Sequence, residues 1–162
     1  MRLVGIDVST YIGLALTRPE KQFDTKLIHF KGVKGIERVA KLQNAVGHVL
    51  DEFEPEVAFV EAYGLSNRFT LVEMVEVGTV VRLELKHRGI PWFNVPPTTL
   101  KQWVAGKGNA KKPDMKRAVE EKWGFTSSSD DVVDAVGLNR FGYAYFAGSL
   151  TDKQREATVR GN

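Results

Sequence analysis

Four acidic residues interrupt apolar segments of the sequence, and their side chains are the best placed to do chemistry. Asp7 lies within the run VGIDV, and Glu61 ends the most apolar run, VAFVE. Asp131 and Asp134 are three residues apart, so on a helix they lie on one face, one turn apart. A buried charge is costly unless it is paired or bound to a metal. The four carboxylates together offer an all-oxygen ligand set, which suits Mg²⁺ or Mn²⁺.

Two such ions about 4 Å apart support in-line phosphoryl chemistry, in which one activates water and the other stabilises the leaving oxygen. Each acid taken alone also fits a simpler interpretation. Asp7 and Glu61 can be charges at strand ends that reach solvent, and Asp130 suits the first turn of a helix because of the helix dipole. Asp134 is harder to explain in this way, because Val133 and Ala135 flank it directly. The convergence of several acids is therefore more informative than any one of them.

A basic segment accompanies these acids. Residues 101–117 contain six Lys and Arg residues and a single acid, Asp114, whereas the whole chain carries a net charge of only +3. A local basic patch favours a polyanionic partner such as nucleic acid, although a solvated lysine-rich surface is the alternative. The segment does not have the spacing of a phosphate-binding P-loop.

The elements that must position these side chains follow from periodicity and turn residues. Strands are expected at 2–8, 11–18, 24–31, 57–63 and 90–95, and helices at 35–53, 70–87, 97–105, 113–123 and 130–147. Residues 106–112 form a Gly/Lys loop. The order predicts an α/β fold with a five-stranded mixed sheet, an antiparallel meander plus parallel strands, flanked by helices on both faces. Strand alternation places Asp7 on the face of Leu3 and Gly5.

Length and composition narrow the class of protein. With 162 residues, 43% of them hydrophobic and 27% charged, the chain predicts one globular domain at 1–148 and a polar, frayed tail at 149–162. There is no cysteine, which excludes disulfides, thiol catalysis and cysteine-based zinc sites. The N-terminus is expected to be a strand and not a signal peptide, so a cytoplasmic location is expected. The 70–87 segment is apolar nearly all round, which suits either a central helix or one covered by a partner subunit.

Taken in order along the chain, these motifs resemble those of the RuvC-like Holliday junction resolvases of the RNase H-like (retroviral integrase) superfamily. The resemblance is that of a divergent, phage-type member. VGIDVS at 4–9 is similar to the family's first strand, and YIGLA at 11–15 to its second. Val60-Glu61 resembles the second carboxylate motif, and DVVDAV at 131–136 is similar to the family's D-x-x-D-A-L pattern. The segment LKQWVAGKGNAKK at 100–112 resembles its basic stretch. The resemblance spans residues 2–145.

The resemblance implies a homodimeric endodeoxyribonuclease that nicks two opposed strands of a four-way DNA junction with two Mg²⁺ ions per site. Asp7, Glu61, Asp131 and Asp134 would bind the metals, and Lys112 would assist catalysis. The helix at 70–87 becomes the candidate dimer interface. The residues expected to contact DNA are Lys101, Gly106, Lys107, Gly108, Lys111, Lys112, Lys116, Tyr63 and Phe69.

Two features depart from the family pattern. An aromatic wedge usually follows the second carboxylate, but Gly64 occupies the corresponding position, so Tyr63 or Phe69 would have to substitute. Tyr63, Phe69 and Trp103 are candidates to stack on unpaired bases, or else core residues. Ala62 also replaces the Gln that often follows the Glu.

Other functions remain open from the residues alone. One is an RNase H-like nuclease acting on RNA–DNA hybrids, flaps or other branched DNA. Another is a non-catalytic junction-binding protein, against which the full carboxylate set argues. A third is a fragment of a sugar-kinase or actin-like ATPase, whose chains can also begin with a G-I-D motif but need two such domains.

Overall fold

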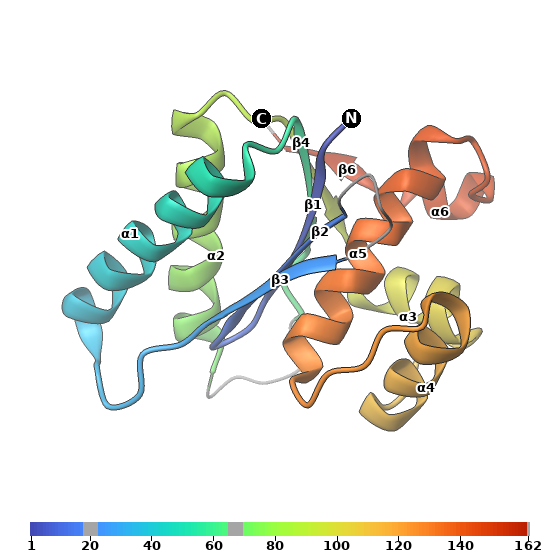
Figure 1. The fold of residues 1–162 in the computed structure, drawn as a ribbon, viewed down its shortest axis with the longest axis horizontal. Coiled ribbons are helices and arrows are strands. Elements are labelled where there is room, and N and C mark those ends of the chain that lie inside the picture. The colour runs from blue at the N-terminus through green and yellow to red at the C-terminus, as the bar shows by residue number, and fades with distance from the viewer. Residues whose placement is uncertain (18–22, 65–69, 162) are drawn as a thin grey trace.

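The computed structural model describes residues 1–17, 23–64 and 70–161. Its centre is one mixed sheet in the order β3-β2-β1-β4-β5-β6 (Figure 1). The strands are β1 (Leu3–Val8), β2 (Ile12–Thr17), β3 (Phe23–Ile28), β4 (Val57–Glu61), β5 (Trp92–Val95) and β6 (Val159–Arg160). The first three strands form an antiparallel meander, and β4 and β5 extend the sheet in parallel with β1. The expected meander followed by parallel strands is confirmed.

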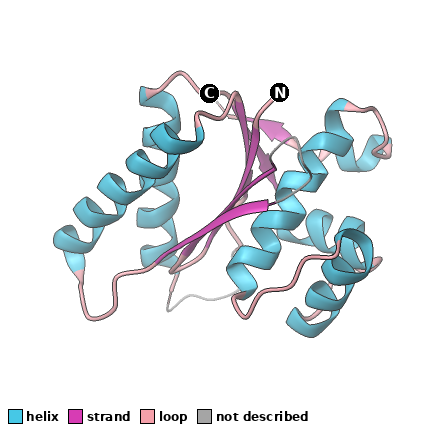
Figure 2. Cartoon of the chain, in the orientation of Figure 1, coloured by secondary structure: helices cyan, strands magenta, loops and turns pink. Residues whose placement is uncertain are grey.

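Helices cover both faces of the sheet, as predicted (Figure 2). On one face lie α1 (Gly35–Phe53) and α2 (Leu71–His87), packed against each other. On the other lie α3 (Pro97–Ala105), α4 (Lys112–Trp123) and α5 (Asp130–Phe146), with α5 across β1 and β2. Each face has its own apolar core. The α1/α2 core includes Ile6 and Val60, and the α5 core includes Leu3 and Phe59.

The C-terminal segment differs from the sequence-based expectation. Residues 149–162 were expected to fray, but α6 (Asp152–Glu156) and β6 lie within this segment, so the sheet has six strands and not five. Thr151 begins α6 with a capping box in which its hydroxyl accepts from the Gln154 amide. The Gly161 amide donates to the Trp92 carbonyl at 2.9 Å. A two-residue strand has no detectable alternation, so the sequence pattern could not reveal it.

No helix among the described residues has the length and apolar character needed to cross a bilayer.

Candidate metal centre and nucleic-acid interface

Two of the predicted acids stand at the ends of neighbouring parallel strands. Ile6 of β1 is in register with Val60 of β4, so the next residues, Asp7 and Glu61, lie side by side at the carboxyl edge. Both point to the α5 face, because Ile6 and Val60 point to the opposite core. Asp7 is only 4% exposed. Parallel pairing therefore brings the buried carboxyl group of Asp7 together with the half-buried one of Glu61.

Two glycines allow α5 to approach these strands. A Cβ atom on Gly5 would lie 2.1 Å from the Ala135 carbonyl oxygen, and one on Gly13 would lie 2.2 Å from that of Asp131. Gly13 is the β2 residue in register with Asp7. Backbone oxygens of a helix cannot move aside as a flexible side chain would, so a larger residue at either position would push α5 away. These glycines bring the acids of α5 to Asp7, and sequence analysis did not assign them this role.

A buried asparagine fixes the position of α5 along the sheet. Asn139 is fully buried, and its side-chain nitrogen donates to the carbonyls of Leu3 (2.6 Å) and Ala15 (3.3 Å). Its oxygen accepts from the Thr17 hydroxyl at 2.5 Å. These bonds join α5 to both β1 and β2. Asn139 was not predicted from the sequence, although a polar residue in the apolar segment VGLNRF is a usable signal.

Asp7, Glu61 and Asp134 form a compact cluster in which one carboxylate oxygen of each lies within 4.8 Å of the others. Burial, and then the charge of Glu61, raises the pKa of Asp7 well above its ordinary value. The same two causes raise the pKa of Asp134 to about 7. Burial also raises the pKa of Glu61. Crowded, desolvated carboxylates favour protons or a cation, so this donor set fits a hard divalent metal ion.

The fourth predicted ligand, Asp131, lies outside that three-residue group. Its Oδ1 accepts a 2.6 Å hydrogen bond from the Ser9 hydroxyl. Ser129, the N-cap of α5, is 3.5 Å from its other oxygen. Asp131 remains close enough for its charge to raise the pKa of Asp7, after the larger effects of burial and Glu61. The structure thus places Asp131 at the rim of the cluster, oriented by Ser9.

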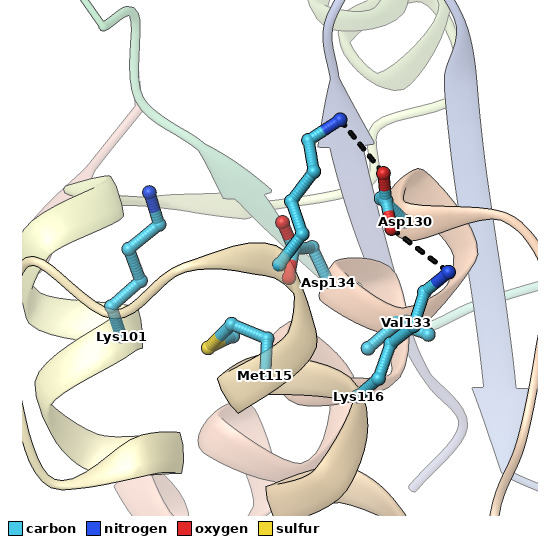
Figure 3. Close-up of a pocket in the computed structure, with 7 residues that line it drawn as sticks. Lys101, Met115, Lys116, Asp130, Val133 and Asp134 are labelled. Atoms are coloured by element: carbon cyan, nitrogen blue, oxygen red, sulfur yellow. Dashed lines mark ion pairs between the residues drawn. The ribbon is translucent and has the colours of Figure 1, made fainter.

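A small pocket of about 80 Å³ lies beside the acids, lined by Lys101, Lys112, Met115, Lys116, Asp130, Val133 and Asp134 (Figure 3). Asp130 forms ion pairs with two of these lysines. Its Oδ2 is 2.7 Å from the Lys112 ammonium, and its Oδ1 is 3.0 Å from that of Lys116. Lys101 extends from α3 on the other side of the pocket. The positive charge of Lys101 opposes the rise in the pKa values of Glu61 and Asp134.

The remaining residues of the basic segment have structural contacts of their own. The Lys107 ammonium pairs with the Asp114 carboxylate at 3.0 Å. The backbone amide of Lys111, the N-cap residue of α4, donates to the same Asp114 carboxylate. Gly106 ends α3 with a φ of +78°, a conformation that favours glycine. A Cβ on Gly108 would lie 3.2 Å from the Thr98 carbonyl oxygen. These contacts shape the loop between α3 and α4, which leads to Lys112, a residue that lines the pocket.

Of the aromatic candidates, two lie among the described residues. Tyr63 is 37% exposed, and its ring packs beneath the guanidinium of Arg82. Trp103 stacks on Trp123 at a centroid distance of 5.6 Å and belongs to the packing between α3 and α4. Phe69 lies outside the described residues. Of these two rings, that of Tyr63 is the more exposed, and it lies two residues after Glu61.

Comparison with known proteins matches residues 4–139 to the family of the crossover junction endodeoxyribonuclease RuvC. A RuvC of Chloroflexus aggregans is 31% identical over 122 residues, which covers 74% of each chain. The Moorella thermoacetica RuvC is 28% identical over 99% of each chain. The fold matches that of T. thermophilus RuvC, solved in complex with a Holliday junction substrate, with a TM-score of 0.76, 20% identity and 99% coverage of each chain. The chain, with its clustered carboxylates on β1, β4 and α5, belongs to the RuvC family.

Proposed function

We propose that this protein is a metal-dependent endonuclease that resolves four-way DNA junctions by paired, symmetric nicks. The observation that carries the proposal is the cluster of Asp7, which is buried, with Glu61 and Asp134, which are half-buried, within 4.8 Å of one another and next to a pocket lined by lysines. Acids in this arrangement suit a divalent metal, and lysines suit the phosphates of DNA. Membership of the RuvC family supports the junction as the substrate.

The metal we propose is Mg²⁺, with two ions per site and Mn²⁺ as a substitute. Asp7, Glu61 and Asp134 would hold the ions, and Asp131 would complete the set from the rim of the cluster. When bound, the ions would supply water activation and charge neutralisation for phosphodiester hydrolysis. The carboxylates themselves fix the positions of these charges, and Asp7 is the one most shielded from solvent.

Lys112 and Lys101 are proposed to act on the phosphate group. Lys112 is exposed and lines the pocket, where a phosphate would reach its ammonium after displacing Asp130. From either side of the pocket the two lysines would offset the negative charge that develops at the scissile phosphate. Lys107, Lys111, Lys116, Gly106 and Gly108 would extend the DNA-binding surface, and Tyr63 would stack on a base.

A symmetric junction calls for a symmetric enzyme, and we propose a homodimer formed through α2. Three apolar side chains on this helix face solvent: Val72 is 69% exposed, Val75 42% and Leu83 41%. The opposite side of α2 packs on α1 and the sheet. Leu83→Glu is expected to weaken self-association, and an unchanged dimer mass for this variant in analytical ultracentrifugation would refute this placement of the interface.

Cleavage of a four-way junction in Mg²⁺, with both nicks mapped, tests the proposed activity. Asp7→Asn is expected to retain junction binding and to lose cleavage. Flap and RNA–DNA hybrid substrates of equal length distinguish a junction resolvase from a general RNase H-like nuclease. Cleavage by Asp7→Asn at the unsubstituted rate would refute the metal centre, whereas preferred cleavage of a flap or hybrid would refute the junction as substrate.

A further inference from the structure

Arg82 of α2 reaches the end of the strand that carries Glu61. Its guanidinium donates to the Glu61 carbonyl oxygen at 3.1 Å and to Oδ1 of Asn94, on β5, at 2.8 Å. A second bond to the same Asn94 oxygen comes from Nε at 3.2 Å. The guanidinium also donates to the Gly78 carbonyl, one turn earlier on α2, at 3.0 Å. One side chain thus joins α2, β4 and β5 next to the carboxylate cluster.

The other side of the guanidinium covers Tyr63. The Arg82 Cζ atom is 4.6 Å from the centroid of the Tyr63 ring, which is within cation–π distance. The ring also packs directly on Gly78, where a Cβ atom would lie 2.4 Å from Tyr63 Cε1. A side chain larger than that of glycine would displace the ring. The backbone just after Glu61 is therefore held both by its carbonyl and by the ring two residues later.

Removing the Arg82 guanidinium from water costs free energy. Burial of the guanidinium lowers the pKa of Arg82, and the groups that accept its hydrogen bonds are neutral: backbone carbonyls, the Asn94 amide and the Tyr63 phenol. Neutral acceptors offset the loss of hydration less well than a carboxylate does. What the contacts do supply is rigidity, because a planar group bonded at several edges permits little movement.

We propose that Arg82 is a positioning residue for the metal centre: it fixes the end of β4 so that the Glu61 carboxylate stays in register with Asp7 and Asp134. This inference rests on the proposed function, since it assigns Glu61 to a metal site. Groups that orient metal ligands typically affect metal affinity by 10- to 100-fold when removed.

Mn²⁺ binding to the metal-free protein, without DNA, tests this role. Electron paramagnetic resonance of free Mn²⁺ gives the affinity directly, and cleavage kinetics give kcat and KM separately. Arg82→Met is expected to weaken Mn²⁺ binding about tenfold and to lower kcat with little change in KM. Arg82→Lys is expected to recover part of both, because an ammonium can still donate to the Glu61 carbonyl. Asn94→Ala, which removes the acceptor that orients the guanidinium, is expected to change Mn²⁺ affinity in the same direction.

Arg88→Met is the matched control. Arg88 follows α2 and pairs with Asp51 and Glu84, between α1 and α2 and away from β4. Its loss is expected to lower the free energy of unfolding without changing Mn²⁺ affinity. Unchanged Mn²⁺ affinity in both Arg82→Met and Asn94→Ala would overturn the role of Arg82, as would an equal loss in Arg88→Met. Failure of the unsubstituted protein to bind Mn²⁺ would instead overturn the metal centre itself, and the role of Arg82 with it.

Discussion

The Ser9 hydroxyl donates a 2.6 Å hydrogen bond to the Asp131 carboxylate and so joins the turn after β1 to the first turn of α5. Ser9 also accepts from the Tyr11 amide at 3.0 Å, which fixes the direction of its hydroxyl. Asp131 is therefore oriented by a neutral donor, while Asp7, Glu61 and Asp134 crowd one another. The four acids do not form one uniform cluster, and among them the loss of Ser9 is expected to affect Asp131 directly.

Ser9→Ala is expected to lower the cleavage rate on the order of tenfold, because Asp131 loses the bond that orients it. The free energy of unfolding should fall by about 2 kcal/mol, because the bond from the Tyr11 amide is lost as well as the bond to Asp131. Single-turnover cleavage and urea unfolding measure the two effects. Ser149→Ala, which removes a hydroxyl beyond the far end of α5, is the control and should leave cleavage unchanged. Equal rates for Ser9→Ala and the control would contradict the role of Ser9.

Asn139→Ala is expected to lower the free energy of unfolding by about 3 kcal/mol. The change leaves the Leu3 and Ala15 carbonyls and the Thr17 hydroxyl without their buried partner, and each unsatisfied buried group costs about 1 kcal/mol or more. Thr17→Val removes only one of these bonds and should cost less. Urea unfolding compares the two variants. A smaller loss for Asn139→Ala than for Thr17→Val would show that Asn139 does not hold α5 on the sheet.

Asp130→Asn is expected to strengthen junction binding several-fold at low salt. The change releases Lys112 and Lys116 from their ion pairs and removes a negative charge beside the DNA path. Fluorescence anisotropy over a range of salt concentrations measures the affinity, and the gain should shrink as salt screens the charges. Asp152→Asn on α6 makes the same charge change at a distance from the pocket. An equal gain in both variants would mean that net charge alone is responsible.

The stability of the metal-free protein is expected to fall as the pH rises from about 4 to about 7. The pKa of Asp134 is raised from 3.8 to about 7 by burial and by the Glu61 charge, so in this window the native state holds a proton that the unfolded chain has released. Raising the pH removes that proton and lowers the free energy of unfolding. The loss of unfolding free energy that comes from Asp134 is absent below pH 3.8 and complete above pH 7. The raised pKa values of Asp7 and Glu61 lower the unfolding free energy in the same direction.

Mg²⁺ should offset this loss, because a bound cation neutralises the same carboxylates. Thermal unfolding at pH 5 and pH 8, with EDTA or with Mg²⁺, measures the effect. Stabilisation by Mg²⁺ should be larger at pH 8, and Asp134→Asn should reduce both the pH dependence and the Mg²⁺ effect. If the metal-free protein became more stable between pH 5 and pH 7, ionisation of these acids would not destabilise the native state, and the prediction would be wrong.

The sequence by itself determined most of the elements and the residue types of the site. Apolar periodicity and turn residues report local burial, and they located the helices α1 to α5 and the strands β1 to β5 to within a few residues. Alternation along β1 placed Asp7 on the face of Leu3, and that face is the one α5 covers. The basic segment likewise stood out by composition alone.

Only the tertiary structure decided which side chains meet. Ser9 and Asp131 are 122 residues apart, and so are Thr17 and Asn139, so no local pattern records either pair. The placement of α5 depends on backbone contact at Gly5 and Gly13, which follows from the packing of a helix on two strands. Whether an acid joins the buried cluster or turns to a neighbouring hydroxyl is settled by distances of a few ångströms. Such distances follow from packing between distant segments, whereas periodicity reports only which face of each segment is buried.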